Sequence, residues 1–250
     1  MKIKIKLISF LIIVCILPTL FFGFKLNSED LFNKIREHYT KNYPNDFVAT
    51  VTGTKINKDL QNPDIIPKSA YCNGKKPMVK YLFLKGEDES IIIENVENPY
   101  VTRFQAHIEI YRNAKSFFES KKTFSEFQKT YYWEYISSLS SNYFVVKMRK
   151  HRVIETDYIL LHFDKRNLSL KKAIQYSNNK PSGTFVLRYK KVKKYLLPSE
   201  LMFTSHDAKS HKQFKLIISN YQVNVGLTPN ILVQLQDDCP SLSKYLSKSN

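Results

Sequence analysis

The strongest constraint on the fold is a succession of β-rich segments in the second half of the chain, with turn residues but no helical pattern between them. Each segment is rich in β-forming residues, many of the segments carry apolar residues at alternate positions, and turns such as Asn178-Asn179 separate neighbouring segments. Strands that follow one another this closely pair as an antiparallel meander, because parallel pairing needs long crossover connections. The predicted strands cover residues 143–148, 158–163, 169–176, 184–191, 197–204 and 214–221.

Two segments in the first half carry apolar residues at helical spacing. In the segment 28–43, Ser28 is suited to cap a helix, and Leu31 and Ile35 fall on one face. The segment 124–139 begins after Thr123, and Glu126 follows three residues later, which is the spacing of a capping box. We therefore expect helices over 28–43 and 124–139.

Further strands are predicted over residues 47–56, 78–85 and 90–94, whereas 101–111 fits either a strand or an extension of the second helix. A sheet of about eight to ten strands curls rather than lying flat. Two helices are available to cover its concave face. Periodicity by itself allows either a sandwich with a filled core or a half-barrel with a helical lid over an apolar cavity. The chain contains 250 residues and no internal repeat, so we expect one domain over residues 25–250.

The N-terminus predicts export. Lys2, Lys4 and Lys6 precede an uncharged apolar run over residues 7–24, as in a secretory signal. The run is interrupted by Pro18 and lies at the short limit for a spanning helix. Residues 1–24 are therefore a signal peptide or an N-terminal anchor, with cleavage favoured, and the mature chain is expected in the periplasm.

The net charge of +17 does not reside in the N-terminal segment, because removal of its three lysines lowers the charge only to +14. An exported chain rarely meets nucleic acid, so we expect no nucleic-acid partner. Anionic membrane surfaces and protein partners are the better candidates. Most of the lysines are expected to keep the turns and edges of the sheet soluble. The basic residues cluster at Lys147, Arg149, Lys150 and Arg152, at Lys171 and Lys172, and at Arg188, Lys190, Lys191, Lys193 and Lys194.

The sequence contains no catalytic motif of the common hydrolase, nucleotide-binding or metalloprotease classes, so an enzyme, a metal site and a cofactor are not expected. His206 and His211 lie near each other in a polar segment that is predicted to be a hairpin tip, which makes a poor metal site. Cys72 and Cys239 either form a disulfide in an oxidising compartment or are two buried free thiols.

From Asp157 onward, the order of features resembles the LolA/LolB family of lipoprotein carriers and their outer-membrane lipoprotein-sorting relatives. The similarity covers about 75 residues. It begins with a strand that ends in Asp164 and a returning strand over 167–176. A strand over 185–191 and a turn before Pro198 follow, and a closing strand contains Tyr221 and Asn224. The chain departs from the family at Lys193 and Lys194, where relatives often have Gly, and in a longer region over 100–142.

The resemblance implies an α+β fold of mostly antiparallel β structure: a curved incomplete β-barrel with a helical lid. Its apolar hollow would hold acyl chains of lipoproteins or phospholipids, in a monomeric periplasmic carrier that an inner-membrane releasing complex loads. The alternative is an envelope stress sensor or interaction protein of the same fold that binds a partner without shuttling it. The candidate lining residues are Phe47, Ala49, Val51, Val79, Tyr81, Phe83, Phe144, Val146, Ile159, Leu161 and Phe163, and the candidate lid residues are Leu31, Ile35, Phe127 and Tyr131.

Overall fold

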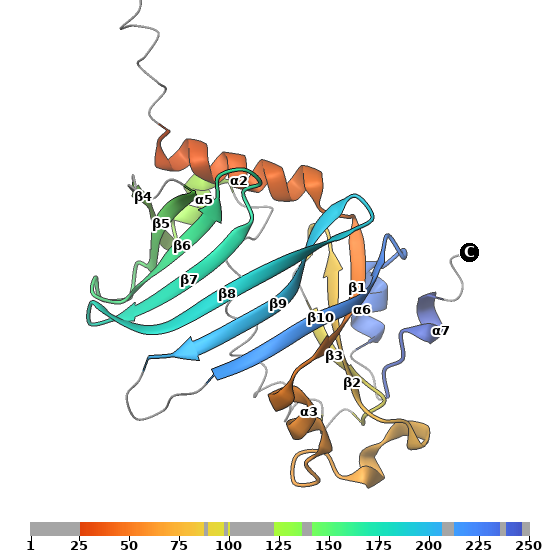
Figure 1. Cartoon of the computed structure of the whole chain (residues 1–250). Coiled ribbons are helices and arrows are strands. Elements are labelled where there is room, and N and C mark those ends of the chain that lie inside the picture. Colours follow the sequence, from red (N-terminus) through yellow and green to blue (C-terminus); the bar gives the residue numbers. More distant parts are fainter. Residues whose placement is uncertain are drawn as a thin grey trace, which may run out of the picture.

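The computed structural model describes residues 26–87, 90–97, 100, 123–136, 142–206, 213–235 and 239–246. Their strands form one curved, open antiparallel sheet in the order β3-β2-β1-β10-β9-β8-β7-β6-β5-β4 (Figure 1). The strands are β1 (Asp46–Thr52), β2 (Met78–Leu84), β3 (Ser90–Glu94), β4 (Tyr131–Ile136), β5 (Tyr143–Lys150), β6 (Tyr158–Asp164), β7 (Leu170–Ser177), β8 (Lys180–Val192), β9 (Tyr195–Ser205) and β10 (Gln213–Val223). The predicted fold class, a mostly antiparallel incomplete barrel with helices, is confirmed.

The helices lie at the two ends of this sheet. Helix α2 crosses the end near β4 and contacts α5, whereas α3 contacts β10 (Figure 1). The C-terminal helices lie beside β1 to β3. The helices are α2 (Ser28–Asn42), α3 (Thr54–Gln61), α5 (Phe124–Gln128), α6 (Pro229–Gln234) and α7 (Ser243–Leu246), with 3-10 turns η1 (Lys68–Ala70) and η2 (Cys72–Gly74).

The meander from β5 to β10 confirms the prediction from alternation and turn residues. Asn178 and Asn179 join β7 to β8 and have φ angles of 51° and 61°. Asparagine tolerates this left-handed region, and such pairs form the tight turns of hairpins. The observed strands extend the predicted ones by a few residues, because pairing with neighbours continues beyond the apolar core of each strand.

The predicted helix over 124–139 is wrong beyond its first turn. The capping box of Thr123 and Glu126 is present, with Glu126 N–H donating to Thr123 Oγ1 over 3.2 Å. Helix α5 nevertheless ends at Gln128, and β4 pairs with β5, placing Trp133 opposite Met148. Aromatic residues such as those of β4 also favour strands, so apolar spacing alone did not distinguish the two structures.

The predicted strand over 47–56 is also too long, because β1 ends at Thr52 and α3 begins at Thr54. The first helix begins at Ser28 as predicted and ends at Asn42, but Ser28 is not its capping residue. Asn27 caps α2 by accepting the Asp30 N–H over 2.8 Å. The Ser28 hydroxyl instead accepts the Tyr135 N–H over 2.9 Å, which ties α2 to the edge strand β4.

The turn between β1 and α3 lies directly against β10. A methyl group at Gly53 would lie 2.3 Å from the carbonyl oxygen of Lys215, which is backbone and cannot move aside cheaply. We therefore expect Gly53→Ala to lower the free energy of unfolding by about 1–3 kcal/mol. Urea denaturation of the wild-type chain and the Gly53→Ala variant tests this.

The control for this variant cannot be Gly74→Ala. A methyl group at Gly74 meets no atom within 4 Å, but the φ of +66° at this residue makes any side chain unfavourable. Lys34→Ala, at an exposed position of α2, is the better control, and equal midpoints for Gly53→Ala and the wild type would contradict the expectation.

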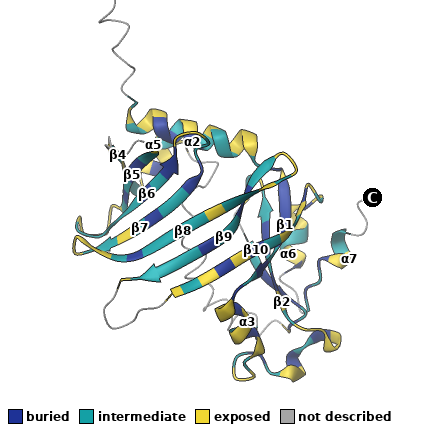
Figure 2. Cartoon of the chain, in the orientation of Figure 1, coloured by how far each residue is buried: buried dark blue, intermediate teal, exposed yellow. Residues whose placement is uncertain are grey.

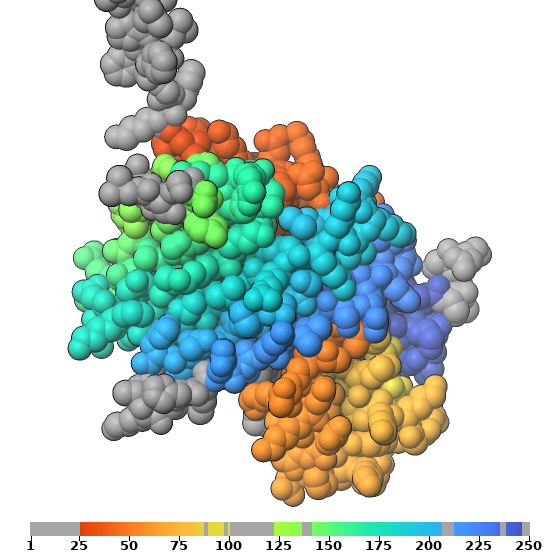
Figure 3. Space-filling model, in the orientation of Figure 1, coloured from red at the N-terminus to blue at the C-terminus, as the bar shows by residue number. Residues whose placement is uncertain are grey.

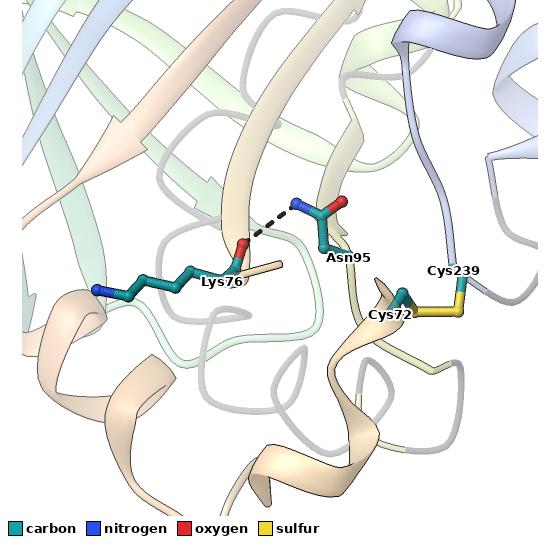
Figure 4. Close-up of a disulfide and its surroundings, with 4 residues drawn as sticks. All are labelled: Cys72, Lys76, Asn95 and Cys239. Atoms are coloured by element: carbon teal, nitrogen blue, oxygen red, sulfur yellow. Dashed lines mark hydrogen bonds between the residues drawn. A yellow bond between two sulfur atoms is a disulfide. The ribbon is translucent and has the colours of Figure 1, made fainter. Parts of the chain in front are cut away.

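The C-terminal segment is attached to the outer side of β1 to β3. Cys72 and Cys239 form a disulfide across a sequence separation of 167 residues (Figure 4). Beside it, the Asn95 N–H donates to the Pro240 carbonyl over 3.2 Å, and the Leu242 N–H donates to Glu94 Oε1 over 2.7 Å. The Asn95 side chain also donates to the Lys76 carbonyl over 3.1 Å (Figure 4). The C-terminal segment is therefore held by one covalent bond to Cys72 of η2 and by two hydrogen bonds to Glu94 and Asn95 at the end of β3.

None of the helices among the described residues is long and apolar enough to cross a membrane. The N-terminal segment 1–24, the ambiguous segment 101–111 and His211 lie outside the described residues.

Candidate functional site

The inner face of the sheet is the face on which α2, α3 and α5 pack. Side chains alternate between this face and the outer face. In β10, whose outer side is largely open, exposed residues alternate with less exposed ones along much of the strand (Figure 2). In β1, for example, Phe47, Ala49 and Val51 belong to the inner cluster, whereas Val48 belongs to the cluster on the other side. The candidate lining residues of β1 therefore lie on the inner face, and a shift of one residue along the strand would have placed them on the outer face. Their role in lining an acyl cavity stays a prediction.

One inner cluster lies beneath α3. Phe47, Ala49, Val51, Val79 and Tyr81 are buried in it, and Phe83 is half-buried at its edge. The Phe47 and Phe83 rings stack with centroids 5.1 Å apart. Ile56 and Leu60 of α3 complete this cluster from above the sheet. These six predicted lining residues are thus brought together, and five of them contact protein on all sides.

The second inner cluster lies beneath α2 and α5. Val146, Leu161 and Phe163 are buried, and Phe144 and Ile159 are half-buried beside them. Leu31 and Ile35 of α2 and Phe127 of α5 cover these residues, as predicted for the lid. Tyr131 also contacts this cluster, but it projects from β4 rather than from a lid helix.

Phe32 and Trp133 organise the cluster beneath the helices, and neither was among the predicted residues. The Phe32 ring centroid lies 5.1 Å from that of Phe127 and 5.6 Å from that of Trp133. Trp133 is 3% exposed, and its Nε1–H donates to the Ser28 carbonyl over 3.3 Å. The helices are therefore held to the sheet by an aromatic cluster and a buried hydrogen bond.

Between the two clusters, the inner face carries a row of half-buried aromatic side chains, which we call the aromatic ladder: Phe185, Phe203 and Phe214. The centroids of Phe185 and Phe203 are 4.6 Å apart, and those of Phe203 and Phe214 are 4.9 Å apart. Phe185 and Leu187 contact both buried clusters. The ladder is the partly open, apolar part of the inner face.

The ladder was missed among the predicted lining residues, although the alternation in residues 184–191, 197–204 and 214–221 contained the information. Phe185 pairs with Phe203, and Phe203 pairs with Phe214, in adjacent antiparallel strands. Directly opposite residues share a face. If the sequence analysis had also predicted which residues of these three strands pair, it would have placed the three phenylalanines side by side.

Solved structures of similar fold exist. The chain is 14% identical to an outer membrane lipoprotein-sorting protein domain from Vibrio parahaemolyticus, covering 81% of this chain and 95% of that one, with a TM-score of 0.48. It is 11% identical to a LolA superfamily protein from Nitrosomonas europaea, over 82% and 96% of the chains, with a TM-score of 0.43. It is 12% identical to a DUF1329 family protein from Desulfovibrio piger, over 80% and 93%, with a TM-score of 0.43.

No family model and no curated protein matches the chain. At these identities and TM-scores, the likeness concerns the general arrangement of the chain. The function is therefore inferred below from the residues of the inner face.

The turn between β6 and β7, which is part of the resemblance to the LolA/LolB family, contains hydrogen bonds to the Asp164 carboxylate. Burial by itself would raise the pKa of this carboxyl, but the backbone N–H of Arg166 at 2.8 Å and its guanidinium hold the pKa below the ordinary value. The Asn167 side chain accepts the Ser169 N–H over 3.1 Å. Asp164 is thus an ionised residue that fixes the β6–β7 turn rather than an acid or base in a cleft.

Several of the basic residues contact aromatic rings. Lys147 Nζ lies 4.4 Å from the centroid of Tyr158, and Lys171 Nζ lies 4.6 Å from that of Tyr189. Arg149 lies 5.0 Å from the Tyr132 ring and forms an ion pair with Glu155 at 3.3 Å. These cations therefore have local partners on the surface. Their expected role at an anionic membrane surface stays a prediction.

His206, which the sequence placed at a hairpin tip, lies with Nε2 2.8 Å from Thr184 Oγ1. Within the described ranges, no group of three or more His, Cys, Asp or Glu side chains is arranged to hold a metal ion.

His162 gives the chain a pH-dependent stability. Burial lowers its pKa below the ordinary value of 6.5, and the charge of Lys172 lowers it further. The unfolded chain therefore binds more protons below about pH 6.5, so this contribution to stability is complete above that pH and is lost as the pH falls towards the lower pKa of the folded chain.

We expect His162→Gln to reduce the loss of stability between pH 7.5 and pH 5.5, as measured by urea midpoints. Burial also lowers the pKa of His38, which acts in the same direction, so the single variant keeps part of the slope. In a double variant at His162 and His38, the urea midpoint should depend on pH even less. An unchanged slope in that double variant would contradict the assignment.

Proposed function

We propose that this chain is a non-enzymatic carrier that holds acyl chains of lipoproteins or lipids against the aromatic ladder of its inner face. The observation that carries the proposal is the half-buried row of Phe185, Phe203 and Phe214 between two closed apolar clusters. Contiguous apolar side chains that are not fully buried offer a surface to an apolar ligand or partner. The ladder is flanked by further apolar side chains, so a long alkyl chain would meet apolar atoms along its length.

The energetics suit reversible transfer. Each buried CH₂ group of a ligand contributes about 0.8 kcal/mol, so a chain of about ten such groups gains roughly 8 kcal/mol without any chemical step. The helices α2 and α5 could also make room for a longer alkyl chain, because they contact the sheet through apolar side chains such as Phe32, Phe127 and the lid residues. A small displacement of these helices would extend the ladder into the cluster beneath them. Leu31, Ile35, Val146 and Leu161 would then also contact the alkyl chain.

The same proposal places the chain outside the cytoplasm. The disulfide between Cys72 and Cys239 is typical of oxidising compartments such as the periplasm. The charged N-terminal segment with its apolar run supports export to that compartment. The excess of basic residues would favour approach to anionic lipid surfaces from which cargo is taken, or to which it is delivered. We propose that the carrier acts as a monomer and receives cargo from a membrane complex.

Native mass spectrometry of the chain purified from its own host tests the proposal. We expect a bound species whose mass matches a lipid or an acylated peptide. After delipidation, the chain should take up a fluorescent long-chain fatty acid with saturable binding. Absence of any bound lipid together with absence of saturable uptake would refute the carrier function. N-terminal sequencing of the same preparation distinguishes a cleaved signal from a retained anchor, and a retained anchor would favour tethered binding over shuttling.

A further inference from the structure

A second concave surface lies on the outer side of the sheet, away from the aromatic ladder. This outer groove has a volume of about 930 Å³ and lies between the outer side chains of β1, β2 and β10 and the C-terminal residues 241–246. Val48 and Met78 contribute apolar side chains from the sheet, and Leu242 and Leu246 contribute them from the C-terminal segment. Met78 is 41% exposed, so its side chain offers an apolar contact to a ligand in the groove. The C-terminal segment lies at the side of the sheet in Figure 3.

The wall of the outer groove is preorganised. The Cys72–Cys239 disulfide anchors its base, and the hydrogen bond from the Leu242 N–H to Glu94 Oε1 at 2.7 Å holds it against β3. Glu94 also forms an ion pair with Lys80 at 3.7 Å, and Lys80 Nζ lies 3.1 Å from Thr50 Oγ1. A ligand that enters such a groove does not need to order its wall, so less of the interaction energy is lost on binding.

The charge of the outer groove is positive. Three lysines line it, Lys75, Lys80 and Lys193, against the single carboxylate of Glu94. Glu94 is engaged by Lys80 in the middle of the groove. Lys75 and Lys193 are exposed, and neither has a carboxylate within ion-pair distance among the residues that the structure describes. The groove therefore attracts anionic groups, above all at the positions of these two lysines.

Lys75 and Lys193 lie at opposite ends of the groove. Lys75 precedes β2, which enters the sheet at Met78. Lys193 belongs to the turn between β8 and β9. Tyr195 follows this turn, and its hydroxyl accepts a hydrogen bond from the Asn224 side chain just after the end of β10. Between these ends, Val48 and Met78 are about four strand positions apart, or roughly 13 Å. The groove is therefore long enough for about five residues of extended chain.

The mixed lining favours a peptide over an alkyl chain. Asn95, Asn220 and Gln222 line the groove together with Ser241 and Ser243. An alkyl chain packed against these groups would remove them from water without replacing their hydrogen bonds, at a cost of about 1–3 kcal/mol for each group left unsatisfied. An extended backbone offers donors and acceptors to the same groups, and its alternate side chains can contact Met78, Leu242 and Leu246.

We propose that the outer groove binds an extended acidic peptide segment of a protein partner, with apolar side chains between its carboxylates. The acidic groups contact Lys75 and Lys193, and the apolar side chains contact the groove floor and the C-terminal wall. This site is separate from the acyl-binding face, so a partner bound there leaves the aromatic ladder open to cargo.

Fluorescence anisotropy with the labelled peptide acetyl-ELELE-amide tests the proposal on the full chain. We expect saturable binding that the double variant Lys75→Glu/Lys193→Glu weakens at least about tenfold. The matched control is Lys34→Glu/Lys180→Glu, which changes the net charge equally at two exposed lysines outside the groove and should bind as the wild type does. All four positions are exposed, and unchanged thermal midpoints will show that both variants fold.

Four results would overturn the proposal. The first three are absence of saturable peptide binding to the wild-type chain, equal losses in the two double variants, and equal binding of the basic peptide acetyl-KLKLK-amide. The fourth is displacement of the acidic peptide by palmitate, which would identify the groove as a lipid site. Fatty-acid uptake is measured in parallel on the Lys75→Glu/Lys193→Glu variant and should equal that of the wild type, because these lysines line the groove and not the aromatic ladder. The two proposals can therefore fail independently.

Discussion

Replacement of Phe203 by glutamate is expected to reduce the affinity for a fluorescent long-chain fatty acid at least about tenfold. Phe203 is the central ring of the ladder, 4.6 Å from Phe185 and 4.9 Å from Phe214 between centroids. A carboxylate at this position removes the continuous apolar contact and would have to be desolvated beneath an alkyl chain, which is unfavourable. Titration of the delipidated chains with the fatty acid measures the change.

The position is half-buried, so the folded state can accommodate the charge in the absence of ligand. Phe203→Leu, which keeps an apolar surface, should retain binding within a few fold. The matched control is Ile217→Glu, because Ile217 is 43% exposed and belongs to a neighbouring strand but not to the ladder. If Phe203→Glu bound the fatty acid as tightly as Ile217→Glu, the ladder could not be the acyl-binding surface.

Removal of the disulfide by Cys72→Ala/Cys239→Ala is expected to lower the free energy of unfolding by about 2–5 kcal/mol. The bond joins residues 167 positions apart, so its loss frees a very long loop in the unfolded chain. For a chain of this size, the thermal midpoint should fall by roughly 5–15 °C. Thermal unfolding followed by circular dichroism, with and without reductant, provides the measurement.

The reductant supplies the internal control. The wild-type chain in reductant should approach the midpoint of the double variant, and the double variant should not respond to reductant. Hydrogen exchange should also increase first in α6 and α7, because the C-terminal segment loses its covalent attachment at Cys239 while the cluster of Val48, Leu82 and Ile92 remains. Equal midpoints for the oxidised wild type and the double variant would show that the bond does not contribute to stability.

The inner face of the sheet and the outer side near β1 have different chemistry. The inner face has apolar side chains in two clusters joined by Phe185 and Leu187. The outer side near β1 carries lysines, amides and hydroxyls around a few exposed apolar residues, beside a disulfide-linked segment. We propose that cargo binds at the first and a protein partner at the second, so that loading and docking use opposite sides of one sheet.

Patterns within a few residues determined much of this fold. The β-rich composition of residues 158–163 and 184–191 and the turn residues around them predicted β6 and β8. The candidate lining residues Phe47, Val79 and Leu161 lie on the inner face, although the sequence did not show that they would be packed into closed clusters. The capping box at Thr123 was also correct, because its two hydrogen bonds are formed by residues only three positions apart.

Only the tertiary structure decided the features that depend on distant partners. Residues 131–136 carry spacing that suits a helix and composition that suits a strand, and pairing of Trp133 opposite Met148 selected the strand. The backbone at Gly53 leaves no room for a side chain, because it lies against the Lys215 carbonyl of a strand about 160 residues later. Likewise, the aromatic ladder requires three strands in one register, and the outer groove forms where the C-terminal residues 241–246 lie beside β1, β2 and β10. Sequence patterns report the preference of a residue for its neighbours along the chain, whereas these features are set by contacts between segments that only folding brings together.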